Sequence, residues 1–168
     1  FRAYQGGICR LVRGSVTAAE VGEHMGQARE ELCGYLERLE SGVLGADRLC
    51  HLLGAPQSGA NTTSWSATLP PLAEQLASDI LGIADEVDRE DVRYIRAMQR
   101  VVVKRAPAAR KSEAKDALLV EEFLDVAQSA RIGGLIAPIV LLTSNFTDFC
   151  DVEHKSKVHP QIASDFHP

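Results

Sequence analysis

A cysteine and two histidines near the C-terminus are the most closely spaced residues that could bind a metal ion. Cys150, His154 and His159 follow a Cys-x3-His-x4-His spacing, and thiolate and imidazole are ligands that zinc prefers. A structural zinc site needs four ligands, normally with a second closely spaced pair, and this segment offers no such pair. We therefore interpret residues 151–168 as a polar C-terminal tail and expect neither a metal site nor a cofactor.

Sequence motifs for catalysis are missing from the chain. It contains no G-x-S-x-G, Walker, G-x-G-x-x-G or H-E-x-x-H pattern. His24 and His51 are isolated, and none of the many carboxylates forms an obvious acid and base pair. This pattern favours a protein that is not an enzyme.

The asparagines and cysteines of the chain indicate in which cellular compartment the protein is found. The chain has two Asn, and both begin glycosylation sequons, Asn61-Thr62-Thr63 and Asn145-Phe146-Thr147. Its four Cys are an even number without a C-x-x-C motif. We expect glycans on Asn61 and Asn145 and a secreted, lumenal or cell-surface location. The alternative is an intracellular or organellar protein with four reduced, core-facing thiols.

The spacing of the cysteines around an expected turn predicts how they pair. If Ser41-Gly42 ends one helix and the next runs back antiparallel, residues equidistant from the turn lie at the same height. Cys33 is eight residues before Ser41 and Cys50 is eight after Gly42. We therefore expect a Cys33–Cys50 disulfide, which leaves Cys9 to pair with Cys150.

Basic residues gather around one expected helix end and the turn that follows it. A helix dipole stabilises cations at its C-terminus, which alone would explain them. Alternatively they form an anion-binding tip for a sulfated glycan, a lipid headgroup or an acidic protein surface. The net charge of −5 argues against nucleic acid as that anion. The residues are Arg100, Lys104, Arg105, Arg110, Lys111 and Lys115.

Two further features allow two interpretations each. Trp65 lies in a polar stretch, either folding back onto the core or serving as an exposed anchor for a partner. The acidic residues of 85–91 form either a solvated face or a patch that attracts cations, although EF-hand spacing is absent.

Capping signals and apolar spacing predict the elements that carry these residues. Thr17 and Glu20 form a capping box, so a helix should run from Thr17 to the turn at Ser41-Gly42. A short helix over 46–53 and an exposed loop over 54–68 should follow.

The second half of the chain predicts further helices. Apolar residues such as Ile95, Met98 and Val102 mark the inner face of a long helix from Pro70-Pro71 to about Arg105. Ser112 should cap the last long helix, which Gly133-Gly134 should break. The apolar residues beyond the break suggest a buried helix over 136–149.

Together these elements predict an all-α fold. We expect an elongated bundle of three long helices and one short helix, forming a single domain over 1–150. No stretch of 18 apolar residues exists, so we expect no membrane insertion. The expected function is a non-enzymatic, secreted or cell-surface module that binds another protein. The alternatives are an accessory subunit of a large intracellular or organellar assembly and, third, an enzyme or a carrier with a small-ligand site inside the bundle.

Overall fold

The fold is all-α, as the capping signals and apolar spacing predict. A computed structural model describes residues 9–56, 64–143 and 145–166, and 64% of them are helical. The chain divides into two compact units instead of one bundle domain with a tail. Unit 1 contains residues 9–11 and Thr17–Ala84, and unit 2 contains Val12–Val16 and residues 85–166.

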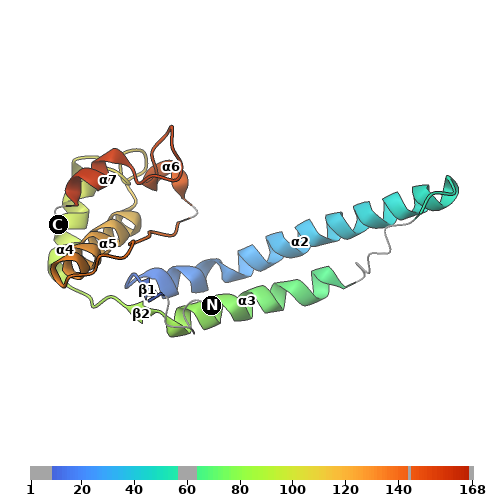
Figure 1. Cartoon of the computed structure of the whole chain (residues 1–168), viewed down its shortest axis with the longest axis horizontal. Coiled ribbons are helices and arrows are strands. Elements are labelled where there is room, and N and C mark those ends of the chain that lie inside the picture. The colour runs from blue at the N-terminus through green and yellow to red at the C-terminus, as the bar shows by residue number, and fades with distance from the viewer. Residues whose placement is uncertain (1–8, 57–63, 144, 167–168) are drawn as a thin grey trace. The chain divides into compact units, whose positions relative to one another are not determined.

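Unit 1 is an antiparallel pair of helices, α2 (Thr17–Leu52) and α3 (Trp65–Ile83), which lie side by side in Figure 1. The expected end at Ser41-Gly42 is wrong, because α2 continues through both residues. A glycine inside a helix costs only about 1 kcal/mol, which good helix formers on either side outweigh. The expected short helix over 46–53 is therefore the last part of α2.

Helix α3 differs from the expected long helix at both ends. It begins at Trp65, so Pro70 and Pro71 lie inside it, and it ends at Ile83 well before Arg105. Beyond Ile83 the chain is extended and forms β2 (Asp85–Glu86). The clustered carboxylates of 85–91 repel one another in a helix, where residues three and four apart are neighbours. In β2 one of them, Glu86, forms a 2.6 Å ion pair with Arg13 instead.

Two short strands pair the segment before α2 with the segment after α3. β1 (Val12–Arg13) lies parallel to β2, with Val12 opposite Asp85 and Arg13 opposite Glu86. The Val87 N–H donates to the Arg13 carbonyl at 3.0 Å and continues the pairing. Both strands belong to unit 2, so unit 1 is inserted into unit 2 along the chain.

Unit 2 is built on α4 (Asp91–Val102) and α5 (Ala114–Ile132), which pack against each other. The predicted break at Gly133-Gly134 is confirmed. Gly134 has a φ of +87°, a left-handed conformation that costs glycine little. The Leu135 N–H then reaches back to the Ala130 carbonyl at 2.9 Å, which closes the helix end.

The expected buried helix over 136–149 is wrong. Residues 135–143 are not helical, and the helix that follows, α6 (Phe146–Phe149), has a single turn. Ile136 is 95% exposed. Arg131 holds the chain in this path, since its Nη1 donates to the carbonyls of Leu135 and Ala137 at 2.6 and 2.9 Å. Pro138 also disfavours helical geometry in the residue before it.

The C-terminal segment is part of the core of unit 2 and is not a polar tail. It contains α7 (Pro160–Asp165), whose Ile162 is only 1% exposed. A mostly polar segment can pack on the core here because Ile162 anchors α7 while most of its other residues stay exposed. The main core cluster consists of Ala106, Val120, Leu124, Phe149 and Ile162, and a second cluster consists of Ala97, Ala117 and Leu118.

Candidate functional site

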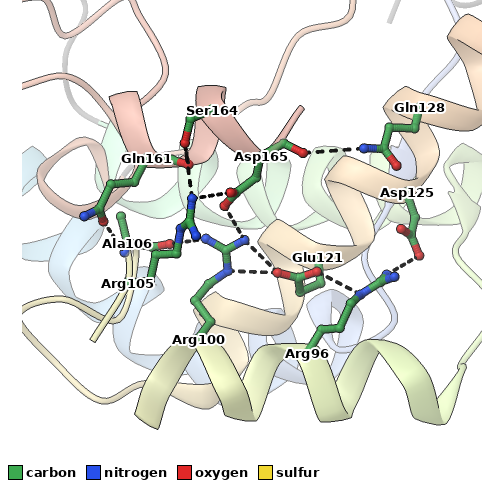
Figure 2. Close-up of polar contacts among 10 residues, drawn as sticks. All are labelled: Arg96, Arg100, Arg105, Ala106, Glu121, Asp125, Gln128, Gln161, Ser164 and Asp165. Atoms are coloured by element: carbon green, nitrogen blue, oxygen red, sulfur yellow. Dashed lines mark hydrogen bonds and ion pairs between the residues drawn. The ribbon is translucent and has the colours of Figure 1, made fainter. Parts of the chain in front are cut away.

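Helices α4 and α5 meet through charged side chains. Arg93, Arg96 and Arg100 recur at intervals of three and four residues, so they share one side of α4. Glu121 and Asp125 are one turn apart on the facing side of α5. Figure 2 shows two of these arginines, Arg96 and Arg100, reaching the carboxylates of α5. We call these five residues the arginine–carboxylate cluster.

Arg100 is the buried centre of this cluster, with a side chain only 5% exposed. Its Nε and Nη2 both donate to Glu121 Oε1, at 2.9 and 2.7 Å. Nη1 donates to the Ala106 carbonyl at 2.7 Å, and Nη2 also reaches Asp165 Oδ2 of α7 at 2.8 Å. Arg100 therefore connects α4, α5, α7 and the turn between α4 and α5 (Figure 2).

Asp125 binds the other two arginines. Arg93 Nε and Arg96 Nη2 donate to Asp125 Oδ2 at 2.7 and 2.6 Å. Burial opposes the charged form of this carboxylate, but the hydrogen bonds from Arg93 and Arg96 outweigh it and lower the pKa of Asp125. Burial likewise opposes the charged form of Arg93, but the hydrogen bond to Asp125 and the negative charges of Glu90, Asp125 and Glu122 together outweigh it and raise the pKa of Arg93. The pair therefore stays charged.

Beside the cluster lies an open polar depression of about 560 Å³. Four members of the cluster line it and bind one another at short distances: Arg96, Arg100, Glu121 and Asp125. A general acid at neutral pH needs a raised pKa, whereas the pKa of Asp125 is lowered. The arginines and carboxylates that line this depression join α4 to α5 and α7.

The opposite side of α4 is apolar and faces outward. Ile95, Met98 and Val102 are exposed, although their spacing predicted the inner face of a helix. With Tyr94, Gln99 and Val103 they line a shallow groove of about 450 Å³. Helix α4 thus turns its arginines inward together with Ala97, while its larger apolar side chains face outward. The sequence analysis did not predict this orientation of α4. The signal that could have revealed it is the match between the spacing of the arginines on α4 and the spacing of the carboxylates on α5.

The expected basic tip is not assembled as a group of six. Arg100 is buried, and Arg105 pairs with Asp165 and donates to Ser164 Oγ at 3.2 Å. Lys111 lies 3.9 Å from Glu113 in an exposed position. Burial of an arginine needs carboxylate partners, and α5 and α7 supply them to Arg100, so Arg100 is not available for an external anion, whereas the side chain of Arg105 is partly exposed. Lys104, Arg110 and Lys115 are exposed.

The hairpin of unit 1 is joined by a different kind of contact. Glu40 of α2 accepts hydrogen bonds from the Ser66 N–H and hydroxyl, both at 2.9 Å. It therefore caps the start of α3, and the Ser66 N–H is the main reason that the pKa of Glu40 is lowered. Pro70 has no N–H to donate to the Ser66 carbonyl, and the Cys33 thiol lies 3.7 Å from that carbonyl instead. Trp65, at the start of α3, is half-buried.

The cysteines do not form the expected Cys33–Cys50 disulfide. All four cysteines, each within the described residues, are free. Cys33 and Cys50 lie on one continuous helix, where 17 residues span about 25 Å, far beyond the reach of a disulfide. The antiparallel turn on which the pairing depended does not exist. Cys9 and Cys150 are in different units, and their pairing stays a prediction.

Of the two expected glycosylation sites, Asn61 lies outside the described residues. Asn145 is half-buried at the start of α6, and its Nδ2 donates to Asp116 Oδ2 at 3.2 Å. Thr147, the third residue of its sequon, is exposed. Glycosylation at Asn145 stays a prediction.

The structure of residues 150–159 explains why the three residues of the Cys-x3-His-x4-His pattern do not come together. Cys150 pairs with Val158 in a β-bridge, and His159 Nδ1 accepts the Gln161 N–H at the start of α7. His154 lies beside Asp151 on the loop between them, at 3.6 Å. Within the described part of the chain, no three His, Cys, Asp or Glu side chains lie close enough together to hold a metal ion.

The described helices include none with the length and apolarity needed to cross a membrane. The chain matches no protein-family model, no curated protein sequence and no solved structure.

Proposed function

We propose that this chain is a non-enzymatic helical interaction module that binds another protein. The observation that carries the proposal is the reversed orientation of α4, whose large apolar side chains lie at the surface while Arg100 is buried against α5 and Arg93 and Arg96 pair with Asp125. Exposed apolar patches of this kind are costly in water and typically mark protein interaction sites.

Repacking α4 with its apolar side inward would replace the cost of exposed apolar surface with another cost. Turning its apolar side inward would require Arg100 to leave Glu121 and Asp165, which would then lose a buried partner. Breaking a buried ion pair by removing one side costs about 3–5 kcal/mol. The cluster thus holds the apolar side of α4 outward, where a partner protein can cover it.

Affinity capture from the native source tests this function. The tagged wild-type chain is compared with an Ile95→Gln/Met98→Gln variant, because both side chains are exposed and their replacement leaves the core of unit 2 intact. We expect a partner at near-equal stoichiometry with the wild type and its loss with the variant. A partner that binds both chains equally, or none with either, contradicts the proposal.

The compartment separates two versions of the proposal. The two sequons favour a secreted or cell-surface module. The free thiols of Cys33 and Cys50 favour the second candidate, an accessory subunit of an intracellular or organellar assembly, because thiols stay reduced there. A mass shift that a glycosidase removes supports the first candidate, and four alkylatable thiols without a glycan support the second.

A further inference from the structure

Helix α3 carries an apolar stripe that α2 does not cover. Leu69, Leu72, Leu76 and Ile80 recur at intervals of three and four residues, and each is at least 40% exposed. The residue of α3 that is fully buried is Pro70, which points about 120° away from Leu76 around the helix axis. The hairpin therefore packs through one side of α3 and leaves the leucine side open.

A second stripe extends this surface onto α2. Leu32, Tyr35 and Leu39 follow the same spacing, and Tyr35 and Leu39 are exposed. When each helix is viewed along its axis from its N-terminus, its apolar stripe is rotated in the same direction from the residues that face the other helix of the hairpin. In an antiparallel pair this places both stripes on the same side of the hairpin. We call this surface the leucine face. Its two rows of apolar side chains resemble two sides of a helical bundle that lacks a further helix.

The net negative charge of the hairpin indicates what kind of helix could pack on the leucine face and complete the bundle. α2 and α3 together contain nine Asp or Glu and three Lys or Arg, and α3 contains no Lys or Arg. Asp79 borders the leucine face on α3, and Glu31 borders it on α2. A second copy of the hairpin would bring the same excess of negative charge, and like charges across an interface disfavour binding.

We propose that the leucine face binds an amphipathic helix of another protein with an apolar side and basic flanks. The apolar side fills the space between the two stripes, and Lys or Arg residues on its flanks lie near Asp79 and Glu31. This is the helix-in-groove mode of recognition, in which anchors at i, i+3, i+4 and i+7 enter an apolar groove. The inference rests on the proposed protein-binding function but uses a different surface from α4.

Two synthetic helical peptides test the inference on the full chain. Both carry the same leucine heptads, and one has Lys and the other Glu at the flanking positions. Fluorescence anisotropy with each labelled peptide should show binding of the Lys peptide at least about tenfold tighter than that of the Glu peptide. Raising the salt concentration should reduce the difference, because the charges are exposed. Equal binding of the two peptides, or no binding of the Lys peptide, overturns the inference.

Matched variants locate the binding. Leu72→Gln/Leu76→Gln should weaken binding of the Lys peptide about tenfold or more, and Glu31→Lys/Asp79→Lys should weaken it while improving binding of the Glu peptide. Ile95→Gln/Met98→Gln on α4 is the control and should leave both affinities unchanged. Unchanged binding of the Lys peptide by the Leu72→Gln/Leu76→Gln chain overturns the inference. The inference also fails if the wild-type chain is a dimer and this double substitution dissociates it, because the leucine face would then bind a second copy of the chain. If the peptides fail but Ile95→Gln/Met98→Gln still removes a native partner, the proposed function stands and this inference alone fails.

Discussion

Units 1 and 2 each contain an antiparallel helix pair, but buried charge stabilises only one of the two pairs. In unit 2, Arg100 is buried between α4 and α5 and also binds Asp165 of α7. In unit 1, the ion pair between α2 and α3 joins Arg29 to Glu74 at 3.4 Å with both side chains partly exposed. Two helices alone cannot surround a charged side chain, whereas a third element can.

The two units also differ in how much of their apolar surface is buried. Unit 2 has two core clusters, which include residues of α5, α6 and α7. Among the described residues of α2 and α3, Leu36 and Pro70 are the buried ones. Unit 1 therefore depends more on helix propensity and caps than unit 2 does. The following predictions test this difference, beginning with the largest expected effect.

Replacing Arg100 with methionine should destabilise unit 2 by about 3–5 kcal/mol, because it leaves Glu121 and Asp165 without their buried partner. The matched change in unit 1, Arg29→Met, should cost less than about 1 kcal/mol, because its ion pair is exposed. Urea unfolding followed by circular dichroism measures both values. Equal losses for the two variants would contradict the contrast between the units.

Shortening Ile162 to valine should destabilise unit 2 by about 1 kcal/mol, since the lost methyl group leaves a small cavity beside Phe149 and Val120. Thermal unfolding of the full chain measures the change. Val158→Ala is the control, because Val158 is exposed and should tolerate the same kind of truncation. An unchanged transition for Ile162→Val would mean that the C-terminal segment does not belong to the core.

Acidification should loosen the contact of α4 with α5. The folded-state pKa of Asp125 is lowered from its ordinary value of 3.8, so its pairing stabilises the fold above that pH. The contribution is lost as the pH falls through the lowered folded pKa, when the carboxylate protonates. Unfolding free energies measured between pH 5 and 2 should therefore fall less steeply in Asp125→Asn than in the wild type. Parallel pH profiles would refute this role.

Replacing Glu40 with glutamine should loosen the start of α3. The carboxylate accepts the Ser66 N–H, and its negative charge favours the helix N-terminus, whereas a glutamine is neutral. Amide hydrogen exchange at Ser66 and Thr68 should become faster while exchange in α5 stays unchanged. In the wild type the same change should appear as the pH falls through the lowered pKa of Glu40. Glu31→Gln, which alters a contact within α2, is the control.

The smallest effect is expected on the leucine face. Leu72→Gln/Leu76→Gln should change the unfolding free energy of the isolated chain by less than about 0.5 kcal/mol per residue, because both side chains are exposed. Urea unfolding measures this value. A loss of several kcal/mol would show that these leucines pack inside the folded chain.

Local signals in the sequence predicted some elements correctly. Thr17 begins α2, the 3–4 spacing of apolar residues identifies α5, and Gly133-Gly134 ends it. These features depend on near neighbours, since a cap, a glycine and one helical turn involve only a few adjacent residues. The same local rules placed an end at Ser41-Gly42, where good helix formers on either side maintain one helix.

From the sequence alone it follows that the chain is helical and that one long helix begins just after Ser112 and ends at Gly133, but the helix expected across 85–91 is absent and β2 stands there instead. The tertiary structure decided which side of α4 faces inward. An apolar stripe and an arginine stripe lie on opposite sides of the same helix, and helical periodicity is equal for both. The outcome depends on Glu121, Asp125 and Asp165, which come from elements distant in sequence and provide partners for three arginines at once. Ion pairing across elements is a property of the folded chain, so it reversed an orientation that hydrophobic spacing alone would have assigned.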